Sequence, residues 1–152
     1  MDKIMSAGFV LMDGDNRLLM CHPTGKPKKE GFWDIPKGCV EYGDLPLEAA
    51  LRELEEETGI ELTEAELNRC MEDCGTYSYG PYKDLHVFVA RWGDMHNAAL
   101  VRQGKLKCKS KFELDGRKVP EMNDYMMSDD LSMLYKSLQP IVSDIIKKCS
   151  VK

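Results

Sequence analysis

The chain has 152 residues, of which 43% are hydrophobic and 31% charged, with a formal net charge of −5 and a pI near 5.3. This length and apolar content predict one compact domain over residues 1–152 that can bury a sizeable core. The negative charge excludes a broad attraction to polyanions, so a nucleotide or nucleic acid has to be held by local positive charge or by a metal ion.

The first part of the chain predicts two strands, a basic loop and a short extended segment. Residues 4–12 and 17–22 are apolar runs separated by the turn sequence DGDN, a pattern typical of a β-hairpin. Residues 23–31 (PTGKPKKEG) predict a loop, and the aromatic run at 32–35 resumes an extended conformation that ends at Pro36. The short apolar run and nearby acidic residues at the start are not typical of a signal peptide.

A helix is predicted from Leu45 to Thr58. Asp44 can cap its N-terminus, and Pro46 suits the first turn, where its missing N–H costs nothing. Gly59 predicts the end of the helix.

The predicted helix has two different faces. Glu53, Glu56 and Glu57 fall at i, i+3 and i+4, so at about 100° per residue their side chains share one side. Like charges at this spacing repel one another and ask for a counter-ion, which makes this face a candidate metal site. A separate apolar stripe can pack into the core while the acidic face lines a cleft. The stripe consists of Leu47, Ala50, Leu51 and Leu54.

The second half predicts further strands and a C-terminal helix. Residues 70–79 and 84–92 predict strands around a turn at Gly80 and Pro81. In the segment 105–113, lysines alternate with apolar or small residues, which predicts a strand with a lysine-lined face. That face either protects a sheet edge from pairing with another chain or grips a phosphate backbone. The lysines are Lys105, Lys107, Lys109 and Lys111.

The end of the chain predicts a turn and a helix. Asp115 and Gly116 predict the turn. From Ser128 onward the pattern predicts a C-terminal helix interrupted or kinked at Pro140, because proline lacks the N–H that a helix interior uses.

The six cysteines predict reduced thiols in a cytoplasmic protein. They are scattered, and the close pair Cys70 and Cys74 has no matching pair elsewhere, so the spacing favours neither a disulfide framework nor a zinc site. No apolar stretch reaches the roughly 18 residues that a membrane span needs.

The segment from Gly38 to Ile60 resembles the Nudix box. Gly38 is followed at the family's intervals by an acidic residue, then by Arg-Glu-apolar-x-Glu-Glu-x-Gly-apolar, which is met here by residues 52–60. One position departs, because Asp44 stands where the family usually has Glu. The resemblance implies an α/β Nudix fold, a mixed β-sheet sandwiched between α-helices. DGRKVPEM at 115–122 is similar to sequences of small bacteriophage and bacterial Nudix hydrolases.

The resemblance also implies a set of site residues. Glu56 and Glu57 would be the main Mg²⁺ ligands, with Mn²⁺ as a possible substitute, and Glu53 would be either a ligand or the base that activates water. The Gly38 carbonyl would join the ligands, since a residue without Cβ lets the ion approach. Arg52 would pair with a box glutamate and fix its rotamer.

Further residues are candidates for ligation or substrate binding. Glu121 lies where related pyrophosphohydrolases often place an acid that faces the box, as ligand or base, and a solvated loop glutamate is the alternative. Lys37 beside Gly38 is a candidate phosphate contact. The aromatic side chains Trp33, Tyr82 and Tyr125 are candidates for stacking on a base, although aromatic residues beside strands are more often core.

The function implied by the resemblance is Mg²⁺-dependent hydrolysis of a pyrophosphate bond in a nucleoside diphosphate linked to another moiety. The sequence FWDIPKG before the box favours ADP-ribose, dinucleoside polyphosphates or FAD. One rival is removal of a cap or pyrophosphate from an RNA 5′ end, which the lysine face would help. Another is a catalytically silent nucleotide sensor, which has little need of the repulsive glutamates. Family members often form dimers, so a homodimer is one expected assembly.

Overall fold

The computed structural model describes residues 3–91 and 98–149. A six-stranded mixed sheet forms the centre of the molecule, with the strand order β4-β5-β1-β2-β8 and with β3 paired to β1. The strands are β1 (Ile4–Met12), β2 (Leu18–Pro23), β3 (Lys37–Cys39), β4 (Met71–Ser78), β5 (Lys83–Arg91) and β8 (Met122–Ser128). Strands β6 (Lys111–Leu114) and β7 (Arg117–Pro120) form a separate two-stranded sheet.

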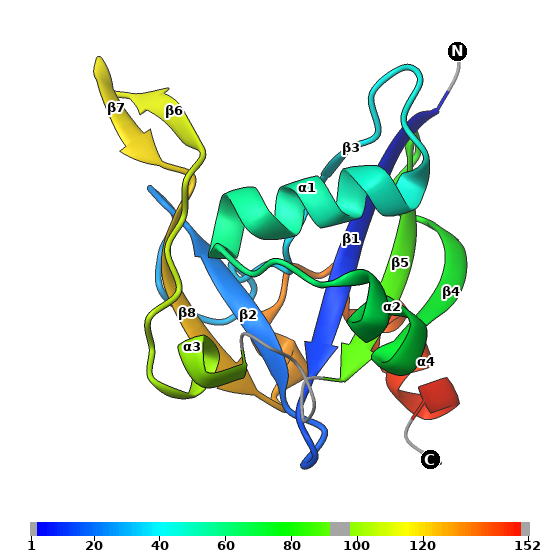
Figure 1. The fold of residues 1–152 in the computed structure, drawn as a ribbon. Coiled ribbons are helices and arrows are strands. Elements are labelled where there is room, and N and C mark those ends of the chain that lie inside the picture. Colours follow the sequence, from blue (N-terminus) through cyan, green and yellow to red (C-terminus); the bar gives the residue numbers. More distant parts are fainter. Residues whose placement is uncertain (1–2, 92–97, 150–152) are drawn as a thin grey trace.

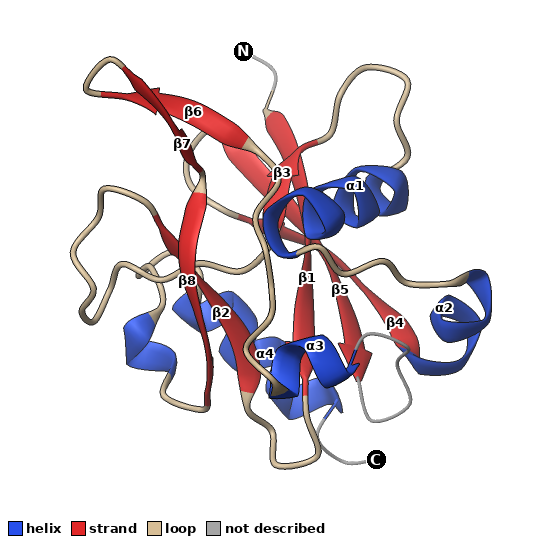
Figure 2. Ribbon diagram, turned by 60° about the vertical axis from the view of Figure 1, so that its left-hand side comes forward, coloured by secondary structure: helices blue, strands red, loops and turns tan. Residues whose placement is uncertain are grey.

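Helices lie on both faces of the six-stranded sheet (Figures 1 and 2). They are α1 (Pro46–Thr58), α2 (Glu64–Cys70), α3 (Ala98–Arg102), the 3₁₀ helix η2 (Leu131–Met133) and α4 (Gln139–Cys149). Helix α1 crosses one face, and α4 lies against the other. The predicted sandwich of a mixed sheet between helices is confirmed.

The two-sided burial of β1 explains its nearly continuous apolar sequence. Phe9 and Leu11 pack with the α1 residues Ala50 and Leu54, whereas Val10 packs in the second cluster with α4. Successive side chains of a strand point to opposite faces, so both faces of β1 are apolar when both are covered. β1 also runs parallel to β5 along its whole length, from Ile4↔Lys83 to Met12↔Arg91. β1 therefore lies at the centre of the sheet, where it pairs with β2, β3 and β5.

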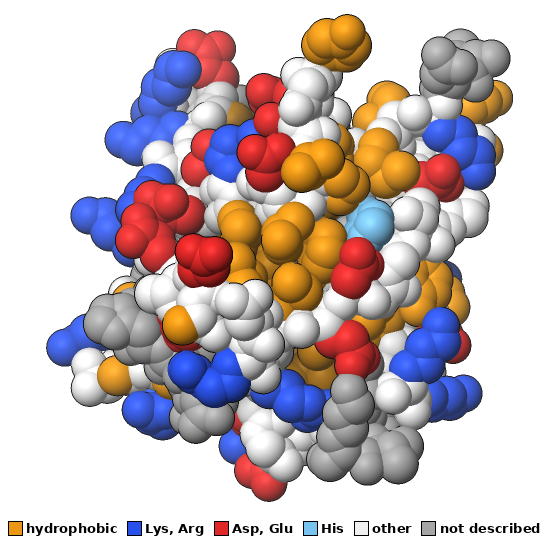
Figure 3. Space-filling model, turned by 45° about the vertical axis from the view of Figure 1, so that its right-hand side comes forward, with side chains coloured by type: hydrophobic (Ala, Val, Ile, Leu, Met, Phe, Trp, Pro, Cys, Tyr) orange, Lys and Arg blue, Asp and Glu red, His pale blue; other side chains and the backbone are white. Residues whose placement is uncertain are grey.

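Some apolar side chains that pack around the sheet are only partly buried. Leu47, Leu51 and Leu62 are partly buried around the cluster beneath α1, and Figure 3 shows a patch of apolar side chains on one face, bordered by acidic, basic and histidine side chains. Within the described residues no helix is long and apolar enough to cross a bilayer.

Most predicted elements are present at the predicted positions. The hairpin of β1 and β2, the box helix and the pair β4 and β5 are confirmed. The turn at Asp115 and Gly116, both with positive φ, joins β6 to β7. Trp92, the predicted last residue of the strand at 84–92, lies outside the described residues. The single domain over residues 1–152 stays a prediction, because part of this range also lies outside the described residues.

Three predictions about elements are wrong. Residues 105–110 do not form a strand, because their N–H groups bond to the C-terminal end of α1: those of Lys107 and Lys109 donate to the carbonyls of Thr58 and Glu56. Pro140 does not kink a helix, since α4 begins at Gln139 and Pro140 sits in its first turn. The helix predicted from Ser128 onward starts only at Gln139, because Ser128 ends β8 and residues 129–138 form the 3₁₀ helix η2 and loops.

Candidate active site

The box helix, α1, is capped at each end by a hydrogen bond from a backbone N–H group. Leu45 caps it, and the Glu48 carboxylate accepts the Leu45 N–H at 2.8 Å. The prediction that Asp44 caps the helix is therefore wrong, because the N-cap is the next residue, Leu45. Gly59 ends the helix with φ 82°, a left-handed conformation that glycine adopts freely, and its N–H donates to the Glu55 carbonyl at 2.8 Å.

Arg52 ties the loop before the helix to the helix itself. Its Nη1 donates to Asp44 Oδ2 at 2.7 Å, and its Nη2 donates to the Cys39 carbonyl at 3.3 Å. The hydrogen bond to Asp44 raises the pKa of Arg52 above its already high value. The predicted pairing of Arg52 with a box glutamate is wrong: its partner is Asp44, whose short side chain reaches Arg52 across the turn. Asp44 therefore forms an ion pair with Arg52 in this chain.

Gly38 makes room for Glu53. A Cβ at position 38 would overlap the carboxyl group of Glu53, so a side chain there would force that carboxyl group to move. The Glu53 carboxyl is thereby held against the backbone of β3. Burial, followed by the neighbouring charges of Glu56 and Glu121, raises the pKa of Glu53 from 4.5 to about 7.

Glu57 is a buried carboxylate at the end of α1. It is only 2% exposed, and its Oε1 has no hydrogen-bond partner among the residues that the structure describes. Burial, then the charges of Asp34 and Glu53, raise the pKa of Glu57 to about 10. An isolated buried carboxylate is costly, so the position calls for a cation or a proton. Packing alone does not explain a buried glutamate whose Oε1 has no partner among the described residues.

Glu57 lines a cleft of about 510 Å³. Segments far apart in the sequence meet there: the loop after β2, the residues around β3, the end of α1 and the junction of β7 and β8. The charged residues of its lining are Lys26, Asp34, Lys37, Glu57 and Glu121.

Lys37 enters the cleft already paired. Its Nζ lies 3.2 Å from Asp34 Oδ2 and 5.2 Å from the centre of the Tyr79 ring. Burial disfavours the charged form of Lys37, but the adjacent Asp34 carboxylate more than offsets this and raises its pKa. Lys37 therefore carries a positive charge at neutral pH in a largely desolvated place, where an anionic ligand feels it strongly.

Glu121 faces the box, as its position in the sequence predicts. It lines the cleft with Glu57, and its charge contributes to the raised pKa values of Glu53 and Glu57. Its backbone is fixed on both sides, because its N–H donates to the Ser110 carbonyl at 3.0 Å and its carbonyl accepts from Thr24 N–H at 2.9 Å. Four carboxylates, Glu53, Glu56, Glu57 and Glu121, thus interact around one region.

The three predicted stacking residues lie outside the lining of this cleft. Trp33 is 5% exposed and packs in the α4-side core, with its ring 5.1 Å from that of His22. Tyr82 is 59% exposed at the turn between β4 and β5. Their assignment as substrate-binding residues stays a prediction without support from the geometry.

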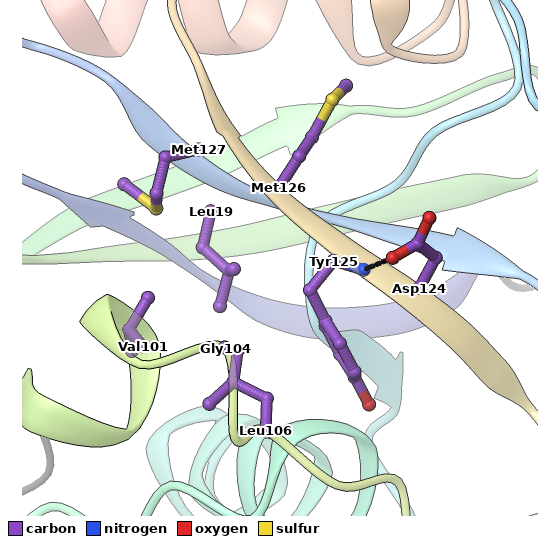
Figure 4. Close-up of a pocket in the computed structure, with 8 residues that line it drawn as sticks. All are labelled: Leu19, Val101, Gly104, Leu106, Asp124, Tyr125, Met126 and Met127. Carbon is purple, nitrogen blue, oxygen red and sulfur yellow. Dashed lines mark hydrogen bonds between the residues drawn. The ribbon is translucent and has the colours of Figure 1, made fainter.

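Tyr125 lines a different, mostly apolar pocket of about 210 Å³ between β8, β2 and the segment 101–106 (Figure 4). Its hydroxyl donates to the Glu57 backbone carbonyl. Leu19, Leu106 and Met127 share this pocket. Tyr125 therefore supports the end of α1 through the Glu57 carbonyl, and nothing in its contacts indicates a ligand.

Sequence reasoning missed several lining residues of the cleft, four of them polar or aromatic. Asp34, Thr24, Phe112 and Tyr135 all contribute to it. Asp34 follows an aromatic run and gives no spacing signal, and Phe112 is one of several residues that alternate with lysines. Within the described residues, no three acidic, His or Cys side chains already surround one point as a formed metal site.

Comparisons with known proteins agree with the fold and the box. Residues 2–126 match the family model of the NUDIX domain. A protein of Enterobacteria phage T4, described as an uncharacterized 17.7 kDa protein in the e-segB intergenic region, is 39% identical over 131 residues, which are 82% of each chain. An 8-oxo-dGTP diphosphatase of Proteus vulgaris is 37% identical over 65 residues, which are 43% of this chain and 58% of that protein.

Solved structures share the fold at low sequence identity. A bifunctional NMN adenylyltransferase/ADP ribose pyrophosphatase from Francisella tularensis, complexed with AMP and a Mn ion, has a TM-score of 0.64 at 19% identity, with 97% of this chain and 42% of that chain covered. A C. elegans Ap4A hydrolase has a TM-score of 0.58 at 19% identity, with 97% and 98% covered. On the match of residues 2–126 and on these likenesses, the chain belongs to the Nudix family and is a Nudix hydrolase.

Proposed function

We propose that the chain hydrolyses the pyrophosphate bond of a nucleoside diphosphate linked to another moiety, with ADP-ribose, dinucleoside polyphosphates and FAD as the first candidates. The observation that carries this proposal is the buried Glu57, which lines a cleft with Lys37 and Glu121 and whose Oε1 has no hydrogen-bond partner among the described residues. Carboxylates there suit a hard divalent cation, and a lysine suits the phosphate chain.

The residues fit a bound Mg²⁺ or Mn²⁺. The candidate ligands are all oxygen atoms, which these ions prefer. The Oε1 atom of Glu57 has no hydrogen-bond partner among the described residues, and Gly38 leaves room for the Glu53 carboxyl. Glu56, Glu57 and Glu53, with Glu121 and the Gly38 carbonyl, would hold it, and the side chains would turn towards one another to do so. A bound divalent cation would neutralise phosphate oxygens and lower the pKa of a water.

The chain's own residues have distinct tasks in this proposal. Lys37, kept charged by Asp34, would contact a non-bridging phosphate oxygen. Glu53 or Glu121 would accept a proton from the attacking water, and the raised pKa of Glu53, about 7, suits a base near neutral pH. Arg52 would act indirectly, because its bonds to Asp44 and the Cys39 carbonyl hold β3 and α1 together.

A substrate panel tests the proposal. Product release would be measured for ADP-ribose, FAD, NADH, diadenosine tri- and tetraphosphate, nucleoside triphosphates, 8-oxo-dGTP and capped or triphosphorylated RNA, with Mg²⁺, Mn²⁺ or EDTA. We expect metal-dependent turnover that is fastest on an adenine compound with two linked moieties. Faster turnover of 8-oxo-dGTP would overturn the substrate assignment and leave the hydrolase assignment intact.

A second candidate function, action on an RNA 5′ end, is favoured by one observation. Lys105, Lys107, Lys109 and Lys111 are all exposed, although only Lys111 belongs to a strand. Lys109 already pairs with Glu55 at 3.1 Å. Replacing the four by glutamine should lower turnover of RNA and spare ADP-ribose if RNA is the substrate; equal effects would exclude this candidate.

Location and assembly complete the proposal. We propose a cytoplasmic protein, in keeping with the free thiols of Cys21, Cys39 and Cys108. The homodimer stays a prediction, which gel filtration coupled to light scattering would test.

A further inference from the structure

Two aromatic side chains of the cleft have no part in the hydrolytic chemistry. Phe112 and Tyr135 line it together with Lys26, Lys37 and Glu57. They come from separate segments, β6 and the loop between η2 and α4. A cleft that combines carboxylates, lysines and aromatic faces can contact more of a substrate than its phosphates.

Phe112 is not explained by core packing. Neither of the two hydrophobic clusters formed by the described residues includes it. It lies on β6, in the two-stranded sheet that projects beyond the six-stranded sheet (Figures 1 and 2), and pairs in register with Val119. Its neighbours Lys111 and Glu113 are exposed, whereas Phe112 is half-buried. The alternation of the strand thus turns the ring towards the cleft and the charged side chains towards solvent.

The position of Phe112 is fixed relative to the carboxylates. The base of the β6–β7 hairpin is closed by the hydrogen bond from Glu121 N–H to the Ser110 carbonyl, 3.0 Å, and Glu121 is itself bonded to Thr24. Leu114, on the same strand, lies close to Gly25, where an added Cβ would come 3.1 Å from its Cδ2. The bonds that hold Glu121 therefore also hold Phe112 beside the loop that carries Lys26.

Tyr135 is fixed from the other part of the fold. Its N–H donates to the Trp33 carbonyl at 2.9 Å, and its own carbonyl accepts from Leu138 N–H at 2.9 Å. Burial, then the charge of Asp34, raises the pKa of its hydroxyl, so the ring stays neutral beside the Asp34–Lys37 pair. The side chain packs partly buried against the α4-side core, and it lines the cleft together with Lys37.

We propose that Phe112 and Tyr135 are the residues of this chain that stack on the aromatic base of the substrate, so that its base and its phosphates occupy one cleft. This rests on the proposed hydrolase site. Stacking of a base on an aromatic ring is worth about 1–3 kcal/mol, which corresponds to roughly a 5- to 150-fold change in affinity.

Binding measurements test the inference without requiring turnover. AMP and inorganic pyrophosphate would be titrated, each with Mg²⁺, into the wild type and into Phe112→Leu and Tyr135→Leu. We expect both variants to weaken AMP binding about tenfold or more and to leave pyrophosphate binding unchanged. Phe32→Leu is the matched control: Phe32 is half-buried, lies under Lys29 at 5.8 Å and is not part of the cleft lining, so both affinities should stay as in the wild type.

The outcomes separate this inference from the proposed function. Unchanged AMP binding in Phe112→Leu and Tyr135→Leu, or an equal loss for AMP and pyrophosphate at an unchanged thermal unfolding temperature, would overturn the inference even if the enzyme hydrolyses ADP-ribose. A selective loss of AMP binding in a protein that hydrolyses no compound of the panel would uphold base recognition and overturn the proposed substrates.

Discussion

Burial decides the behaviour of Glu57. With 2% of its surface exposed and a pKa raised to about 10, its carboxyl is protonated at neutral pH when no cation is bound. Losing that proton becomes favourable only if a positive charge replaces it. A single side chain thus links folding stability to ion binding, and both can be measured.

Stability should fall with rising pH in the metal-free protein. The folded state keeps the Glu57 proton from its ordinary pKa of 4.5 up to about 10, while the unfolded state releases it. Stabilisation is therefore complete below about pH 4.5 and is lost as pH rises towards 10, at up to about 1.4 kcal/mol per pH unit. Urea unfolding in EDTA at pH 5, 7 and 9 would show this slope. Glu57→Gln should flatten it, and equal slopes in both proteins would refute the assignment.

The fit between Gly38 and Glu53 predicts a selective effect on activity. In Gly38→Ala the new Cβ would displace the Glu53 carboxyl, so we expect kcat to fall at least tenfold. Gly14→Ala is the control, since nothing lies within 4 Å of a Cβ there. Steady-state kinetics on the best substrate would compare them. Comparable kcat values in the two variants would mean that the position of Glu53 is not important for catalysis.

At the scale of elements, the box helix was readable from the sequence because its signals are local. The apolar stripe, the i, i+3, i+4 glutamates and the glycine stop all act within a few turns. Helix α2 was also signalled locally, by the capping box of Thr63 and Glu66, which sequence analysis passed over. The segment 105–110 was mispredicted because its alternation is real, with exposed lysines, but its hydrogen-bond partners are on α1. Period alone cannot reveal a distant partner.

The end of the box helix provides a stability prediction. Gly59→Ala should lower the free energy of unfolding by about 1 kcal/mol for its positive φ, and further because the Lys107 carbonyl lies 3.3 Å from the added Cβ. Gly75→Ala has nearly the same φ, 81°, with nothing within 4 Å. The difference between the two in chemical denaturation isolates the contact with residue 107. If both variants lost the same stability, that contact would be negligible.

At the scale of the whole molecule, the cleft is assembled from segments that the sequence keeps apart. Glu57 is on α1, Lys37 on β3, and Phe112, Glu121 and Tyr135 come from the last third of the chain. Box residues and Glu121 were predicted because motif and position identify them. Phe112 and Tyr135 were not, because only the three-dimensional path of the β6–β7 hairpin and the η2 loop brings them to the carboxylates.

The alternation of side chains along an extended segment also explains why Trp33 does not line the cleft. Trp33 directly precedes Asp34, which lines the cleft, yet Trp33 forms a bridge to Leu134 and packs in the α4-side core. Neighbouring residues of an extended chain face opposite sides, so closeness to a motif does not establish contact with its ligand.

The central claim is that the box carboxylates form the hydrolytic site. The most direct test compares two single glutamate-to-glutamine substitutions on α1. Mg²⁺-dependent product release would be measured for the wild type, Glu57→Gln and Glu55→Gln on the best substrate of the panel. Glu55 pairs with Lys109 at the surface and does not line the cleft, so its change should leave turnover close to that of the wild type. We predict a loss of about a hundredfold or more in Glu57→Gln. Full turnover in a folded Glu57→Gln would contradict the account.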